Sequence, residues 1–182
     1  MKSVLEQLRG PPEPATTRAQ PSVSAADVGL LLIRLAVGLV MAGHGAQKLF
    51  GLFGGHGLVV TGKGFAALGY HPGWLYAIIG GGSEFLGGLG LALGLLTPLA
   101  AAALVGVMLN AIVTVTSAHG LWETHGGMEY NLCIMAVAVG IAAIGPGRLA
   151  LDRPFRWGRG GWGAAAVALA LGGLGASVVL IL

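Results

Sequence analysis

Residues 28–49 read VGLLLIRLAVGLVMAGHGAQKL, an apolar run about as long as the ~20 residues that a helix needs to cross a bilayer. Only two side chains in this run, Arg34 and Lys48, carry a full charge at neutral pH. A soluble helix would alternate polar and apolar faces, whereas this run is apolar on nearly every side. The run therefore predicts a membrane-spanning helix.

Four further apolar runs of similar length follow, at residues 74–96, 98–118, 128–146 and 162–182. Only 9% of the 182 residues are charged and 55% are hydrophobic, whereas a soluble domain is about 25% charged. A soluble fold would therefore lack the charge to cover its surface. The 34 glycines suit closely packed membrane helices. We expect an all-α integral membrane protein in contact with the lipid bilayer, built as a four-helix bundle with a fifth, C-terminal transmembrane helix.

The polar segments divide the chain into three parts. Residues 1–27 are polar and proline-rich, lack the apolar core of a signal peptide, and are expected to form a disordered cytoplasmic tail. Residues 28–153 would form the four-helix membrane domain, and residues 154–182 an arginine-rich connector with the fifth helix.

Lysine and arginine residues orient the chain in the membrane. The N-terminal tail and the last connection together carry seven of them, against two on the opposite side. The positive-inside rule then predicts a multi-pass protein of the cell membrane with a cytoplasmic N-terminus. Basic residues placed at the ends of apolar runs indicate membrane orientation, so we expect no nucleic-acid partner.

We single out five polar side chains within the predicted spans, because ionisable and strongly polar residues are costly enough there to be functional hypotheses. They are Arg34, His44, Lys48, Glu84 and Asn110. At about 1.5 Å per residue, Glu84 and Asn110 lie at one depth and His44 about one turn nearer the outside. Because helical side chains lean toward the N-terminus of their helix, His44 and Glu84 are expected to converge. The alternative is a structural network that holds the helices together.

Glu129 opens the fourth predicted span, where a negative charge complements the helix dipole. It would lie level with Lys48, which predicts an ion pair at the outer rim. The preceding connection also contains His119 and His125, but their spacing matches no strong zinc motif. We therefore expect no metal site.

Four ordered motifs together resemble the DoxX family. They are Arg34, Gly38, His44, Gly45 and Lys48 in the first span, residues 80–88 with Thr97 and Pro98, residues 127–131, and residues 145–152. The resemblance covers about residues 28–153 and implies a four-helix membrane fold. It also implies a role beside respiratory or thiol redox chemistry. One branch of the family looks like the membrane subunit of a thiosulfate:quinone oxidoreductase, and others are linked to quinone or catechol resistance and to oxidative-stress complexes.

The polar residues and the resemblance together predict a redox membrane protein that binds a quinone headgroup in a polar intramembrane site. His44 would donate a hydrogen bond to a quinone carbonyl and Glu84 would relay the proton, which makes them the predicted catalytic pair. Arg34 would supply a fixed positive charge to a reduced anion. The other predicted binding residues are Lys48, Asn110 and Glu129. No flavin, haem or iron–sulfur motif appears, so electrons would come from a partner or a dissolved donor.

Two other classes of function fit the same sequence. A non-catalytic subunit that anchors or stabilises a larger membrane complex would account for the small-residue helix faces and the fifth span. A small transporter would account for the buried charges. The expected protein partners are a larger membrane redox complex or further copies of the same chain.

Overall fold

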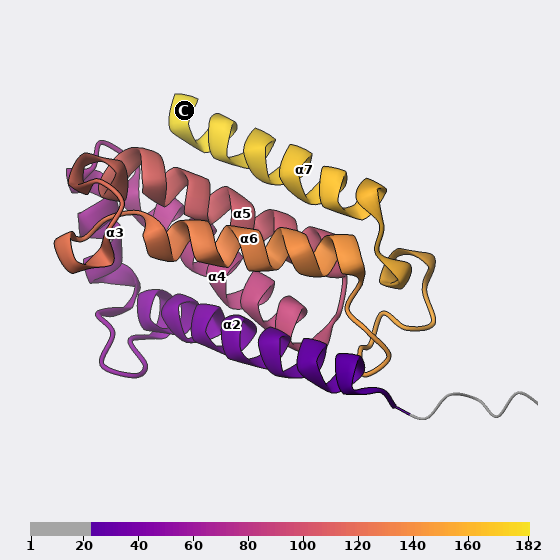
Figure 1. The fold of residues 1–182 in the computed structure, drawn as a ribbon. Coiled ribbons are helices and arrows are strands. Elements are labelled where there is room, and N and C mark those ends of the chain that lie inside the picture. Colours follow the sequence, from indigo (N-terminus) through magenta and orange to yellow (C-terminus); the bar gives the residue numbers. More distant parts are fainter. Residues whose placement is uncertain (1–22) are drawn as a thin grey trace, which may run out of the picture.

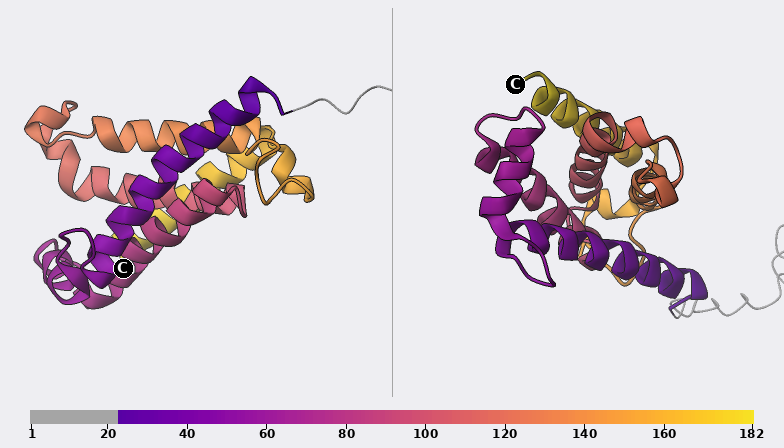
Figure 2. Two further views of the ribbon diagram at one scale, coloured as in Figure 1. Left: turned by 90° about the horizontal axis from the view of Figure 1, so that it is seen from below. Right: turned by 90° about the vertical axis from the view of Figure 1, so that its left-hand side faces the viewer.

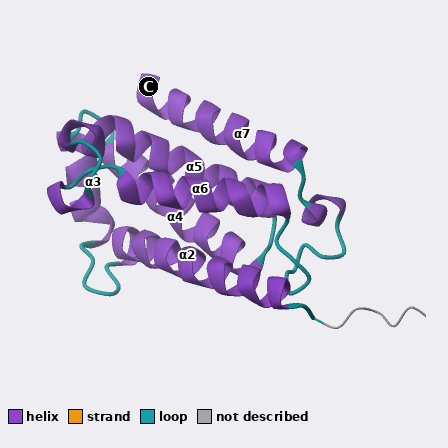
Figure 3. Cartoon of the chain, in the orientation of Figure 1, coloured by secondary structure: helices purple, strands orange, loops and turns teal. Residues whose placement is uncertain are grey.

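The computed structural model describes residues 23–182, and these residues form helices and loops without strands (Figure 3). The long helices are α2 (Ala25–Phe50), α4 (Gly73–Leu93), α5 (Thr97–Ala111), α6 (Glu129–Ile144) and α7 (Trp162–Ile181). The shorter elements are α3 (Gly57–Ala67), the π-helix η1 (Ile112–Thr116), and the 3-10 helices η2 (Ser117–His119), η3 (Glu123–His125) and η4 (Arg156–Arg159). The predicted all-α membrane bundle with a fifth C-terminal helix is confirmed. Most of the predicted tail, residues 1–22, lies outside the described part of the chain.

Four of the helices are long and apolar enough to cross a membrane: α2, α4, α7 and the continuous run of α5, η1 and η2. The helix α6 is shorter than its predicted span of residues 128–146, with 16 residues, or about 24 Å. It ends early because Gly145 takes a φ of 92°, which helical residues do not adopt.

The long helices alternate in direction, so the chain has two distinct ends (Figure 1). The start of α2, the α4–α5 turn and residues 145–161 lie at one end, which we call the connector end. The helix α3, residues 112–128 and the C-terminus lie at the other, which we call the α3 end (Figures 1 and 2). The connection between α2 and α4 was predicted only as a polar stretch, and α3 within it is an addition to that prediction.

Close approach of α2 and α4 depends on glycine, as expected for the closely packed membrane helices of a glycine-rich chain. A Cβ atom on Gly38 would lie 2.6 Å from the carbonyl oxygen of Gly88, and one on Gly45 would likewise collide with the backbone of α4. The glycines of α4 face three different neighbours. Gly88 faces α2, whereas Gly87 faces α5 and Gly80 faces a ring of α3.

The core lies around α5, which packs against α4, α6 and α7. Its buried side chains include Leu104 and Met108, which join a cluster with Met41 of α2 and residues of α4, α6 and α7. The helix α7 packs on α5 and α6, and a Cβ atom on Gly106 of α5 would lie 3.1 Å from the carbonyl oxygen of Gly172. The fifth helix is therefore an integral part of the bundle, added on the side of α5.

Candidate functional site

An ion pair joins α2 to α4 near the α3 end. Lys48 Nζ donates to Glu84 Oε1. The Glu84 side chain is only 4% exposed, whereas that of Lys48 is 35% exposed. The second carboxylate oxygen, Oε2, is also buried and has no hydrogen-bond partner among residues 23–182. The pair therefore connects the outer surface of the protein to a buried acceptor.

His44 does not converge on Glu84 as expected. It is exposed, and its ring meets Tyr130 of α6 edge-on with centroids 6.0 Å apart. The residue of α2 that faces α4 is Gly45, and neighbouring residues of a helix point about 100° apart. Depth along a helix does not depend on rotation about the helix axis, so the predicted depths did not determine which side of α2 faces α4. Lys48, which lies three residues beyond Gly45, points toward Glu84 instead.

Glu129 begins α6 as predicted. The ion pair expected between Glu129 and Lys48 is wrong, because the ion-pair partner of Lys48 in the described structure is Glu84. The physical reason is the packing order: α2 lies closely against α4 along much of its length and touches α6 only slightly. Glu129 and Lys48 therefore form no ion pair in the described structure, although they were predicted at the same depth.

Asn110 of α5 is oriented by a tyrosine from the turn after α3. The Tyr70 hydroxyl donates to Asn110 Oδ1 at 2.9 Å, and the buried Asn110 Nδ2 has no partner within the described chain. The π-helix η1 begins two residues later, and Thr114 Oγ1 donates to the Asn110 carbonyl oxygen at 2.9 Å. Single π-helical turns of this kind often occur at functional sites.

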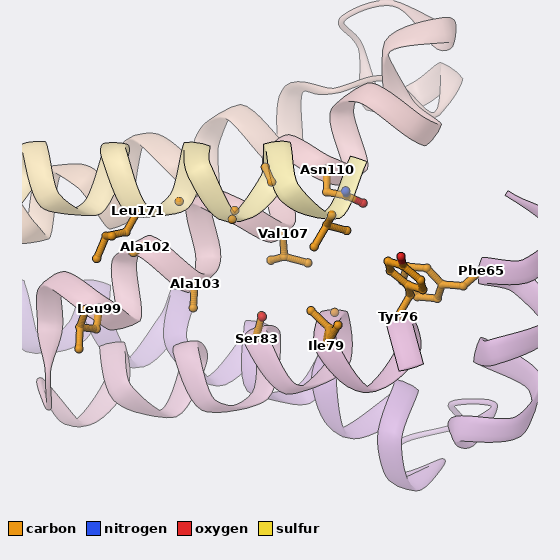
Figure 4. A pocket seen from close by; sticks show the side chains of 16 residues that line it. Phe65, Tyr76, Ile79, Ser83, Leu99, Ala102, Ala103, Val107, Asn110 and Leu171 are labelled. Atoms are coloured by element: carbon orange, nitrogen blue, oxygen red, sulfur yellow. The ribbon is translucent and has the colours of Figure 1, made fainter. Parts of the chain in front are cut away.

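Glu84 and Asn110 line one cavity of ≈ 420 Å³ at the α3 end, which we call the polar cavity. Its polar lining residues are Lys48, His56, Thr61, Glu84, Asn110 and Thr114. A second cavity of ≈ 290 Å³, the apolar cavity, lies between α4, α5 and α7 (Figure 4). Phe65, Val107 and Asn110 line both cavities. A polar chamber and an apolar chamber thus adjoin at Asn110.

Arg34, predicted to supply a fixed positive charge to a reduced anion, lies at the connector end and not beside Glu84. Its guanidinium is fully buried and donates to the carbonyl oxygens of Pro146 at 2.6 Å and Leu149 at 2.8 Å. Arg34 precedes Lys48 by fourteen residues, or about 21 Å along α2. Arg34 holds the connector to α2.

Asp152, to which the sequence assigned no role, completes this anchoring. It accepts hydrogen bonds from the Thr97 backbone NH and hydroxyl, both at 2.7 Å, and from the Leu96 NH and Trp157 indole NH, both at 2.9 Å. Burial by itself would raise the pKa of Asp152, but these hydrogen bonds outweigh it and hold the pKa below its ordinary value. The α4–α5 turn and the connector are therefore joined through one carboxylate.

Neither His56, which lines the polar cavity, nor Tyr70, which bonds the lining residue Asn110, was predicted as a site residue. Tyr70 lies in the connection that was predicted only as polar, and its contact with Asn110 spans 40 positions, so no local pattern indicates it. His56 was assigned no role as a loop histidine, yet it lines the cavity. Among residues 23–182, no three His, Cys, Asp or Glu side chains are grouped to hold a metal ion.

Residues 29–117 match the family model DoxX. This chain is a DoxX family membrane protein. The matched segment runs from α2 into η2 and includes every residue that lines the polar cavity of the DoxX protein. The helices α6 and α7 lie beyond it. No curated protein and no solved structure matches the chain.

Proposed function

We propose that this DoxX protein binds a quinone headgroup in the polar cavity and serves as the membrane component of a redox system. One observation carries the proposal: Glu84 Oε2 and Asn110 Nδ2 are buried, have no partner in the described chain, and line the same cavity. A buried polar atom without a hydrogen bond costs about 1–3 kcal/mol, so a ligand that satisfies both atoms would be stabilised there.

The chemistry of these atoms fits a quinone in either oxidation state. Asn110 Nδ2 is a donor, and the Lys48 ammonium has three N–H donors of which one is directed at Glu84. Both can donate to a quinone carbonyl oxygen. The free Glu84 oxygen can accept from the hydroxyl group of the reduced form. When bound, a quinone supplies reversible uptake of two electrons and two protons.

The ion pair gives the cavity a path for protons. Glu84 can act as a general acid or base toward the headgroup, because a carboxyl group within hydrogen-bond reach of an oxygen can give or take its proton. Lys48 extends from Glu84 to the surface, where its side chain is 35% exposed. These two side chains would carry a proton between the exposed end of Lys48 and the ligand. The electrons would come from a partner subunit or a dissolved donor.

The test is quinone content of the purified DoxX protein, with Glu84→Gln as the main variant. The amide keeps the size of the carboxyl group, so the fold should persist, but it removes the charge and one acceptor. We expect the variant to lose at least about tenfold in affinity for the reduced form of a decyl-substituted benzoquinone, whose hydroxyl group needs this acceptor, or about 1.4 kcal/mol.

Glu123→Gln is the matched control, since Glu123 is exposed at the same end of the molecule and does not line the cavity. It should bind the reduced decyl probe as the unmodified protein does. Equal binding by all three proteins, or no binding by any, would overturn the proposal. Stoichiometric co-purification of a large partner without bound quinone would support the anchoring function instead.

A further inference from the structure

The apolar cavity continues away from the polar cavity along α5 and α7. Most of its lining is aliphatic or aromatic, and its α7 wall contains Gly172, Gly175 and Ala176, of which Gly175 has open space where a Cβ atom would lie. A further hollow of ≈ 450 Å³ at the connector end, which reaches Trp157, shares Leu99 with it. From Asn110 to Leu99 the path along α5 is about 16 Å. Apart from Tyr76 and Ser83, the polar residue in the lining of the apolar cavity is Asn110, at the end next to the polar cavity.

We infer that the apolar cavity holds the apolar tail of the ligand whose headgroup occupies the polar cavity. The ligand class is then a long-tailed membrane quinone and not a small water-soluble quinone or catechol. This inference rests on the proposed function and deepens it.

The shape and chemistry of the path select this occupant. A peptide or a charged molecule would bury hydrogen-bonding groups against aliphatic walls at a cost of several kcal/mol per group in a dry site. A hydrocarbon chain has no such groups, and it gains from burial in proportion to its length. The cavities meet at Asn110, so one amphiphile with its head at Glu84 and its tail along α7 would occupy both.

The helix α7 offers a matched pair of positions for the test. A Cβ atom on Gly175 would meet nothing within 4 Å, and Gly175 lines the apolar cavity, so Gly175→Leu should fill the cavity without a clash. A Cβ atom on Gly173 also meets nothing within 4 Å, but Gly173 does not line the cavity. Both substitutions replace a glycine within the same helix, so they should change helix propensity equally.

The experiment measures two probes on the full-length protein in lipid nanodiscs: a benzoquinone with a decyl chain and the same ring with a methyl group in its place. Gly175→Leu should weaken binding of the decyl probe at least tenfold and change that of the methyl probe less than twofold. Gly173→Leu should change neither. Unchanged binding of the decyl probe to Gly175→Leu would overturn the inference, and so would an equal loss of both probes, which would indicate a distorted headgroup site.

Glu84→Gln, measured with the reduced forms of the same two probes, separates failure of this inference from failure of the proposed function. If Glu84→Gln weakens binding of both probes while Gly175→Leu weakens binding of neither, the proposed headgroup site is supported and the inferred tail site is wrong. If Glu84→Gln affects neither probe, the proposed function falls. A loss of the decyl probe in Gly175→Leu alone would then mark a site for lipid or detergent chains and overturn the inference as well.

Discussion

The Tyr70 hydroxyl donates a hydrogen bond to Asn110 Oδ1 at 2.9 Å and thereby links the turn after α3 to α5. This hydrogen bond determines which end of the Asn110 amide remains available to a ligand. With its oxygen held by Tyr70, the Asn110 amide is left with its NH₂ group, a buried donor that has no partner in the described chain. Tyr70 is thus a positioning residue for the proposed headgroup site.

Tyr70→Phe should weaken binding of the decyl benzoquinone about fivefold, since one net hydrogen bond of about 1 kcal/mol no longer orients the amide. The phenyl ring keeps its packing against Tyr76, so thermal stability should fall by only a few degrees. The control is Tyr130→Phe, which removes a buried hydroxyl that contacts Met41 Sδ outside the polar cavity. Identical affinities for both variants would remove Tyr70 from the site.

The Lys48–Glu84 pair should appear as energetic coupling in a double-mutant cycle. Lys48→Met leaves a buried carboxylate without its partner and should lower the free energy of unfolding by about 1–3 kcal/mol, less than for a fully buried pair because Lys48 is partly exposed. Adding Glu84→Gln should restore part of this loss. The same cycle between Lys48 and Glu129 should be additive, and additive effects for Lys48 and Glu84 would contradict the structure. Denaturant unfolding in detergent provides the measurement.

Asp152→Asn should lower the free energy of unfolding by about 2–3 kcal/mol at neutral pH, because charge-assisted hydrogen bonds to the α4–α5 turn are lost. The pKa of Asp152 lies below its ordinary value in the folded protein, so its stabilising effect is complete above the unfolded-state pKa of about 3.9 and disappears as pH falls through the folded pKa. The difference in melting temperature between the two proteins should therefore shrink on acidification below about pH 4. A difference that stays constant down to acidic pH would contradict the assigned pKa direction.

Arg34→Lys should reduce stability without changing quinone affinity. A lysine ammonium cannot reproduce the planar fork that bonds the carbonyl oxygens of Pro146 and Leu149 together, and a loss of about 2 kcal/mol is expected. The measurement pairs the melting temperature with binding of the decyl benzoquinone by the folded fraction. Weakened binding in a fully folded variant would return Arg34 to the ligand site.

Reporter fusions test the orientation that the basic residues predict. Fusions at His56 and Trp122 should report outside, and a fusion at Phe155 should report inside. The polar cavity would then lie near the outer face of the membrane. An inside signal at His56 would reverse the orientation and place the proposed proton path on the cytoplasmic side.

Depth in the membrane was predictable from the sequence because it grows linearly with position along a helix. Glu84 and Asn110 were placed at one level, and they line one cavity. Rotation about the helix axis was not predictable in the same way. Whether His44 or Lys48 reaches Glu84 depends on Gly45 packing against α4, and hence on the close approach of two helices.

Long-range partners were the second limit. Arg34 bonds carbonyl groups more than 110 positions away in the chain, and backbone carbonyls leave no trace in a residue pattern. The motif at residues 145–152 could be recognised in the sequence, but in the structure its residues anchor the connector. The helix α3 was missed because its 11 residues are too few to cross a membrane and too apolar to resemble a soluble helix.

The separation of the connector end from the α3 end has an evolutionary consequence. The bonds of Arg34 and Asp152 that fix the loops are at the first end, and the cavity around Glu84 is at the second. Substitutions that reshape the chamber need not disturb the anchoring of the loops, and those that strengthen the anchor need not alter the chamber. A bundle arranged in this way can change its ligand preference through substitutions at the α3 end, while the bonds at the connector end continue to hold its fold.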